Sequence, residues 1–325
     1  MWNVRLQAVA RQGVEAISVR LDLTQGSRLA ILLPNGPSAV VWITAAKRSG
    51  IIFCAVAAGT AASSVATRLT DTMASVLITA ESVVPSAQEA MEIVADKVTI
   101  RGVIAEPEQL AGPTPAGWSL ASELLAPLQT LVPSPAEVSA IDLVRACWHT
   151  CLAPPLPLDA SYPLFALYTS GSTGKPKGIV HTHGGYQVGI VATTAIVFDA
   201  QPGKDVLFVV ATPGWITGQS YMIAASLLCR TPSVLLDGSP VSPPDRFAAI
   251  IARHKVSILK AGSTFLRMLA TREGSVELLA KHDLSCLRIG TFCAEPVNEA
   301  VHRFASKHLT ENYIVRPHPL PRLHP

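Results

Sequence analysis

The chain has 325 residues, of which 49% are hydrophobic and only 15% charged, and its formal net charge is +3. This length allows one large core or two lobes, and the low charged fraction makes a membrane segment the first alternative to test. The longest apolar stretch, residues 51–66, falls short of the ~20 apolar residues that a spanning helix needs. Basic residues are scattered along the chain, which argues against a nucleic-acid-binding surface. The composition therefore predicts a folded protein without a membrane span.

The N-terminus and the cysteines indicate the compartment. Residues 1–20 contain three arginines and one acidic residue, a composition faintly similar to a mitochondrial transit peptide. Their apolar spacing favours an amphipathic helix instead. The six cysteines form neither a CxxC pair nor a dense disulfide framework, so we expect mostly buried thiols in a reducing compartment. We therefore predict a cytoplasmic protein, with the mitochondrial matrix as the alternative.

The first 105 residues alternate between short apolar runs and segments with helical spacing. We expect strands at residues 28–33, 51–56 and 75–79, and helices at 38–47 and 64–73. This rhythm is typical of an α/β lobe in which helices cover a parallel sheet. Residues 106–162 contain nine prolines, which break any long element, so we interpret them as a connection between two lobes.

Residues 163–312 resume the same rhythm and form the predicted second α/β lobe. It begins with a strand at 164–169, a Gly-rich loop and a helix from about Gly184. Further strands are expected at 205–211, 233–236, 256–260 and 286–290, and further helices at 220–228, 244–254 and 264–271. Both lobes are therefore predicted to contain parallel sheets covered by helices.

The Gly-rich loop carries the clearest chemical signal in the sequence. It reads Tyr168-Thr-Ser-Gly-Ser-Thr-Gly-Lys-Pro-Lys-Gly178. Its glycines allow positive φ and close approach of a ligand, so that backbone N–H groups can surround an anion. Hydroxyl side chains add hydrogen-bond donors, and two lysines add positive charge. This composition predicts a site for the phosphates of ATP.

Two other interpretations of the loop agree with it less well. The Walker A loop requires Ser or Thr after Gly-Lys, whereas Pro176 follows Lys175 here. A helix that starts at Lys175 is also disfavoured directly before a proline. The remaining alternative is a solvated Ser/Gly hairpin loop with incidental lysines, which does not account for ten residues of this order and composition.

Residues 169–178 resemble the signature loop of the adenylate-forming (AMP-dependent) acyl-CoA synthetase superfamily. Four further segments are similar to its acetyl- and propionyl-CoA synthetase branch. These are residues 26–82, His181-Thr-His-Gly-Gly-Tyr186, Gly214-Trp-Ile-Thr-Gly-Gln-Ser-Tyr221 and Cys293-Ala-Glu-Pro-Val-Asn298. The resemblance covers nearly all of residues 15–313 and implies a partial N-terminal domain of that synthetase fold.

The resemblance implies ATP-dependent activation of a short-chain carboxylate to an acyl-adenylate and then to acyl-CoA, with ATP, Mg2+ and coenzyme A. The nucleotide would be held by Thr169, Ser170, Gly171, Ser172, Thr173, Gly174, Lys175, Lys177, Ala294, Glu295 and Pro296. The acyl pocket would be shaped by Trp215, Ile216, Thr217 and Cys293. Neither a catalytic residue nor a protein ligand for a metal is assigned, and the oligomeric state stays open.

Some of these side chains also have simpler interpretations. Trp215 is equally consistent with a core tryptophan, and Lys177 with a solvated lysine. His181 and His183 can approach phosphate, although solvated loop histidines are the usual case. Cys293 is interpreted as pocket lining rather than as a nucleophile, because no histidine lies near it in the sequence.

The chain also departs from the family pattern. Gln219 replaces the usual His, Thr212-Pro213 replaces an Asp-Val pair, and Ala294 replaces a glycine. Residues 81–86 lack the basic side chains that relatives carry for coenzyme A, and no Thr-Glu segment follows Asn312. We expect residues 313–325 to form a disordered, atypical tail. The alternative to a ligase is therefore a non-catalytic, truncated nucleotide-binding remnant of the same fold.

Overall fold

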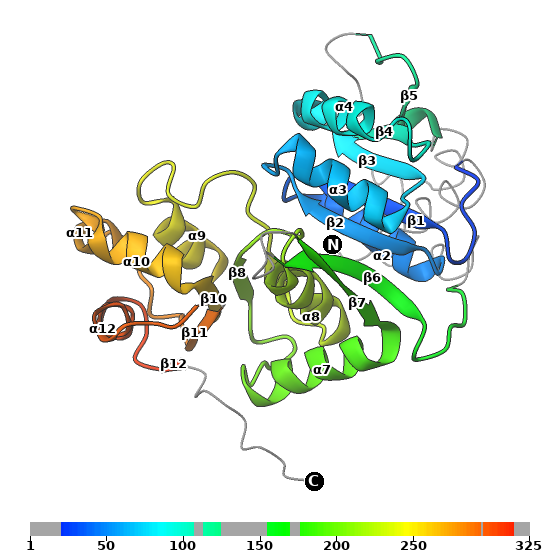
Figure 1. Cartoon of the computed structure of the whole chain (residues 1–325). Helices are drawn as coiled ribbons and strands as arrows, with labels where there is room; N and C mark the ends of the chain where they lie inside the picture. The colour runs from blue at the N-terminus through cyan, green and yellow to red at the C-terminus, as the bar shows by residue number, and fades with distance from the viewer. Residues whose placement is uncertain (1–20, 107–112, 125–154, 170–175, 294, 315–325) are drawn as a thin grey trace, which may run out of the picture. The chain divides into compact units, whose positions relative to one another are not determined.

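The computed structural model describes residues 21–106, 113–124, 155–169, 176–293 and 295–314. The chain divides into two compact units, Met1–Tyr186 and Gln187–Pro325, and the described part of each contains one sheet with helices packed on it (Figure 1). Among the described strands, every pair except β6–β7 is parallel, which confirms the predicted α/β class. Within these residues, no helix has both the length and the apolar character needed to cross a membrane.

The first unit is built on a seven-stranded sheet with the strand order β5-β4-β3-β1-β2-β6-β7. The strands are β1 (Arg28–Leu33), β2 (Ile52–Ala57), β3 (Val76–Ala80), β4 (Arg101–Glu106), β5 (Trp118–Leu120), β6 (Pro163–Thr169) and β7 (Lys177–Thr182). β1 and β3 are buried along almost their whole length, as their continuous apolar runs predict for strands covered on both faces.

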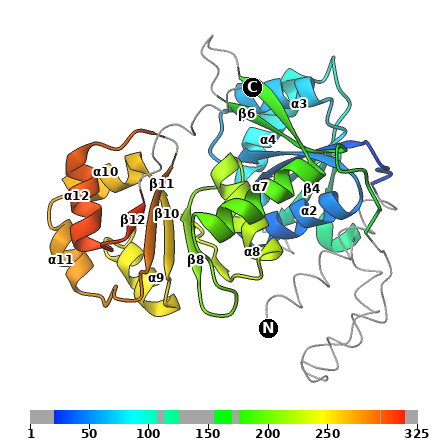
Figure 2. The same cartoon turned by 90° about the horizontal axis from the view of Figure 1, so that it is seen from below.

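Helices cover both faces of this sheet. They are α2 (Pro37–Arg48), α3 (Ala62–Thr72), η2 (Glu81–Val83) and α4 (Val84–Ile93). Crossovers between parallel strands are right-handed. The crossover through α2 runs from β1 to β2, whereas those through α3 and α4 run across the sheet in the opposite direction, towards β4. For this reason α2 lies on the face opposite α3 and α4 (Figure 2). α2 starts with a proline in its first turn and ends with Lys47 and Arg48, whose charges suit the C-terminal end of the helix dipole.

Residues 163–182 were expected to open the second lobe, but they complete the first sheet. β6 pairs in parallel with β2, and β7 pairs antiparallel with β6. The division between the units falls after Tyr186 rather than at residue 163. The physical reason is apolar packing on the β2 edge, where Phe165 is fully buried and its ring centroid lies 5.3 Å from that of Phe53.

The second unit contains a parallel sheet with the strand order β12-β11-β10-β8-β9. Its strands are β8 (Leu207–Val210), β9 (Ser233–Val234), β10 (Ile258–Gly262), β11 (Ile289–Cys293) and β12 (Tyr313–Ile314). Its helices are η3 (Gly218–Ala224), α8 (Ala225–Leu228), α9 (Arg246–His254), α10 (Ser263–Thr271), α11 (Ser275–Ala280) and α12 (Glu299–His308), and α7 (His183–Ile196) spans the division. A hydrophobic core lies between the sheet and α9, α10 and α12, on the face opposite α8 (Figure 2).

Several boundaries differ from those expected. β10 and β11 begin two and three residues later than predicted, and β11 is delayed by a turn in which the N–H of Leu287 donates to the carbonyl of Leu284. Tyr313 and Ile314 pair with β11 as β12, so these two residues do not belong to a disordered tail. Residues 1–20 and 315–325, for which a helix and a tail were predicted, lie outside the described residues.

Candidate functional site

The residues expected to bind ligand follow the carboxyl ends of parallel strands. In the second unit, residues 215–217 follow β8, residues 295–296 follow β11, and β10 lies between these two strands in the sheet. Because neighbouring parallel strands end at the same edge, both segments lie on the edge where α/β folds usually bind ligands. In the first unit, the Gly-rich loop follows the carboxyl end of β6.

The Gly-rich loop is closed at its base by an antiparallel ladder. Thr169 lies opposite Lys177, and Tyr168 lies opposite Gly178. Thr169 and Lys177 are both exposed, and as directly opposed residues their side chains share one face of the hairpin. The structure therefore brings one expected hydroxyl donor and one expected cation together at the mouth of the loop. The strand β7, which creates this arrangement, was not predicted.

The ring of Tyr168 limits the space beside Gly178, whereas the φ of Gly178 does not call for glycine. Its φ lies outside the left-handed region, which corrects the expectation that this glycine supplies a positive φ. An added Cβ would lie 3.1 Å from the ring of Tyr168, closer than almost all real contacts of a Cβ atom. Glycine at this position thus lets the aromatic ring cover the neighbouring strand.

Tyr168 connects the base of the loop to α3. Its hydroxyl donates a hydrogen bond to Oδ2 of Asp71, and the guanidinium carbon of Arg68 lies 5.3 Å from the ring centroid. Burial, together with the hydrogen bond to Asp71, raises the pKa of Tyr168 well above its usual value, so the hydroxyl stays a donor. This contact joins residues 97 positions apart, and no local sequence pattern predicts it.

Other expected ligand-binding residues lie outside the described residues. They are Ser170, Gly171, Ser172, Thr173, Gly174 and Lys175 in the loop, and Ala294 after β11. Their roles stay predictions. What the structure describes of this loop is the β6–β7 ladder at its two ends.

The two histidines after the loop are partly buried. The ring of His181 stacks on Phe165, with centroids 4.7 Å apart, and lies edge-on to Tyr186. Burial lowers the pKa of His181, and burial followed by the charge of Lys47 lowers the pKa of His183. Both side chains therefore favour the neutral form, and His181 packs on β6 through Phe165.

Residues 215–217 are accessible. Trp215 is 55% exposed and Ile216 40% exposed, which contradicts the interpretation of Trp215 as a core residue. Thr217 directly precedes η3, a π-helix of seven residues, and such turns are frequent at functional sites. Only glycine fits at position 218, because a Cβ there would lie 2.0 Å from the carbonyl oxygen of Thr212.

The departures at positions 212 and 219 leave polar atoms beside this segment. Gln219 is fully buried, and its Nε2 donates to the carbonyl of Pro213 at 2.8 Å. The Oε1 of Gln219 and the Oγ1 of Thr212 are buried and have no hydrogen-bond partner within the described residues. Buried polar atoms without partners are rare in folded proteins, so these two suit a bound water or ligand.

The segment after β11 is held by the start of α10. Ser263 Oγ donates to the main-chain carbonyl of Glu295 at 2.9 Å, and Thr264 Oγ1 donates to Oε2 of Glu295 at 2.6 Å. A nitrogen of Arg267 lies 3.8 Å from the same carboxylate oxygen. Cys293, the last residue of β11, is partly exposed. Ser263, Thr264 and Arg267 were not predicted, although a pair of hydroxyl residues directly after a strand was a usable signal.

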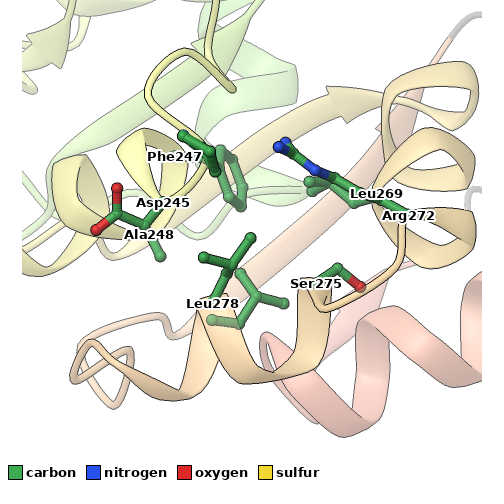
Figure 3. Close-up of a pocket in the computed structure, with 9 residues that line it drawn as sticks. Asp245, Phe247, Ala248, Leu269, Arg272, Ser275 and Leu278 are labelled. Carbon is green, nitrogen blue, oxygen red and sulfur yellow. The ribbon is translucent and has the colours of Figure 1, made fainter.

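The cavity drawn in Figure 3 is separate from these segments. It is lined by residues of α9, α10, α11 and their ends, including Asp245, Phe247 and Arg272. Its volume of about 10 Å³ has room for about one water molecule. In the part of the chain that the structure describes, no three His, Cys, Asp or Glu side chains group as a metal site.

A Ser/Gly/Lys loop after one strand, with further segments at the carboxyl edge of a parallel sheet, is typical of nucleotide-binding α/β proteins. The family model described as AMP-binding enzyme matches residues 8–316. The chain belongs to this family.

The names of curated relatives agree with this family assignment. The chain is 36% identical over 281 residues to "Acetyl-coenzyme A synthetase 2" of Saccharomyces cerevisiae, an alignment that covers 84% of this chain and 38% of the relative. It is 33% identical to "Acetyl-coenzyme A synthetase" of Mycobacterium tuberculosis H37Rv, with 87% of this chain and 42% of the relative covered. It is 34% identical to the protein of the same name from Gemmatimonas aurantiaca, with coverages of 89% and 43%. The chain thus spans about two fifths of the length of these relatives.

Proposed function

We propose that this chain provides the nucleotide-binding part of an AMP-forming acid–CoA ligase that acts on a short-chain carboxylate such as acetate or propionate. The observation that carries this function is the β6–β7 hairpin. Its paired residues Thr169 and Lys177 present a hydroxyl and a cation at the mouth of the Gly-rich loop. The acetyl-CoA synthetase names of the relatives support the substrate class.

In this reaction a carboxylate oxygen attacks the α-phosphorus of ATP, and the bond to pyrophosphate breaks. The thiolate of coenzyme A then attacks the acyl carbon, and AMP leaves. Residues 169–175 and Lys177 would hold the β- and γ-phosphates through N–H groups, hydroxyls and positive charge. Mg2+ bound with the nucleotide would neutralise part of the phosphate charge. The chain thereby contributes mainly positioning and charge stabilisation.

The acyl group would lie beside Trp215, Ile216, Thr217 and Cys293. The accessible side chains at 215 and 216 and the unpartnered buried atoms of Thr212 and Gln219 fit a ligand at this edge of the sheet. A tryptophan at the pocket favours a short acyl chain. Ala294, Glu295 and Pro296 would lie along the adenosine part of the nucleotide.

Pyrophosphate release from ATP, measured with and without acetate, propionate and octanoate, tests this function. Release that requires acetate or propionate, and is slower with octanoate, is the result expected of the ligase. Binding of ATP with release at background level would favour the alternative of a non-catalytic nucleotide-binding remnant. A chain that neither binds ATP nor releases pyrophosphate would contradict both.

A further inference from the structure

We infer that the first turn of α10 positions the nucleotide-contacting segment, and that Glu295 acts through this turn rather than by touching the ligand. Ser263 and Thr264 are then positioning residues for residues 295–298. This inference rests on the proposed function, because it assumes that these residues lie along a nucleotide. It changes the role of Glu295 from a ligand contact to a structural link.

The link consists of two hydroxyl groups, one bonded to the main chain and one to the side chain of Glu295. Ser263 is 1% exposed, and its hydroxyl donates to the main-chain carbonyl of Glu295. Thr264 donates to the side-chain carboxylate of the same residue. Main chain and side chain of Glu295 are thereby held by consecutive residues, which leaves its segment little freedom to rotate.

The bond from Thr264 contributes more than the nearby ion pair. An O–H to carboxylate bond of 2.6 Å is charge-assisted and of good length. Arg267 approaches the same oxygen only to 3.8 Å, and both side chains of this pair are about half exposed. Exposed pairs of this kind contribute little. Of the two groups that contact this carboxylate, Thr264 is therefore the one whose loss should disturb Glu295 more.

The turn that holds Glu295 is itself anchored. β10 and β11 are adjacent parallel strands with Gly262 opposite Cys293, so both segments leave the sheet side by side. α10 packs on the hydrophobic core through Leu266, which is fully buried, and Leu269, which is 4% exposed. Packing in the core therefore positions Thr264, and the hydrogen bond from Thr264 positions Glu295.

Binding of two probes separates positioning from general stability. AMP carries the adenosine part, whereas inorganic tripolyphosphate engages only the phosphate loop. For Thr264→Val we expect the Kd for AMP to rise about fivefold or more, and the Kd for tripolyphosphate to stay within about twofold. Thr264→Ser keeps the hydroxyl and should restore AMP binding.

Thr271→Val is the matched control. Thr271 lies on the same helix, and its hydroxyl donates only to carbonyls of that helix, at 3.0 and 3.4 Å. This variant should leave both Kd values unchanged. An unchanged Kd for AMP in Thr264→Val, or equal weakening of both probes, would overturn the inference while the proposed function stands. A wild-type chain that does not bind AMP would instead contradict the proposed function itself.

Discussion

At the scale of single residues, the base of the proposed phosphate loop is packed against Tyr168. The ring of Tyr168 covers Gly178, and its hydroxyl is bonded to Asp71 on α3. The two strands that bound the loop are therefore joined to α3 by a packing contact. A change in this contact should alter phosphate binding without removing any phosphate ligand.

Gly178→Ala tests this contact. Its Cβ would lie 3.1 Å from the ring of Tyr168, so the ring has to move, and we expect a loss of about 1–3 kcal/mol in the free energy of unfolding. Binding of tripolyphosphate should weaken as well. Urea unfolding and titration calorimetry measure the two effects.

Gly189→Ala is the control for that change. It lies within α7, and no atom lies within 4 Å of its added Cβ. Alanine there should be neutral or stabilise by up to about 1 kcal/mol. Equal behaviour of the two variants would show that the Tyr168 contact has no energetic role.

The lowered pKa of His181 predicts that the free energy of unfolding depends on pH. Burial lowers the pKa of His181 in the folded chain below the ~6.5 of an unfolded histidine. As the pH falls through this range, the unfolded state takes up the proton first, so the free energy of unfolding decreases towards acid pH. At pH values well above 6.5, both states are neutral and the effect vanishes.

His181→Phe keeps an aromatic ring on Phe165 and removes the titrating group. The decrease in the free energy of unfolding between about pH 7.5 and 5.5 should be smaller in this variant than in the wild type. Chemical denaturation at several pH values measures both slopes. Identical slopes would exclude His181 as a source of the dependence.

At the scale of elements, Arg288 joins the start of β11 to the segment that precedes β8. It precedes β11 and donates to Asp205 at 2.7 Å, to Asp199 at 2.9 Å and to the carbonyl of Asp199 at 2.6 Å. Burial alone would raise the pKa of Asp205, but hydrogen bonds from Arg288, Gln201 and Ser257 outweigh it and lower the pKa. The carboxylate is thus charged, nearly buried and dependent on its partners.

Arg288→Leu should therefore destabilise the second unit by about 2–4 kcal/mol, because it leaves the Asp205 carboxylate without its cation. Arg288→Lys should recover only part of this loss, since an ammonium group lacks the planar fork of guanidinium. Hydrogen exchange of β8 and β11 localises the effect. Exchange that is unchanged in Arg288→Leu would contradict a stabilising role.

Elements with a strong local pattern were predictable, and those defined by distant partners were not. β1 was expected at its observed bounds, because an apolar run ends at a Pro-Asn-Gly turn signal. β7 was missed because residues 177–180 are exposed on both faces and only the pairing with β6 makes them a strand. The hydroxyls that hold Glu295 were missed for the same reason, since Thr264 and Glu295 are 31 positions apart.

At the scale of the whole molecule, the composition and the βαβ rhythm were sufficient for the α/β class. They were not sufficient for the division between the units. The edge of the first sheet selects β6 by packing Phe165 near Phe53, across the proline-rich connection. Whether β6 joins this sheet depends on how its side chains fit against those of β2, and the spacing of residues along the chain does not show this. The Gly-rich loop consequently belongs to the first unit, and the segments after β8 and β11 belong to the second.

The most direct measurement is the affinity of the chain for ATP in the wild type and in Lys175→Ala, by titration calorimetry. Removing one lysine from a phosphate site should weaken binding about tenfold or more. Lys204→Ala is the control, because this exposed lysine bonds only to Gln201 within its own turn, and it should bind ATP as the wild type does. Equal affinities of Lys175→Ala and the wild type would show that residues 169–178 are not the phosphate-binding loop.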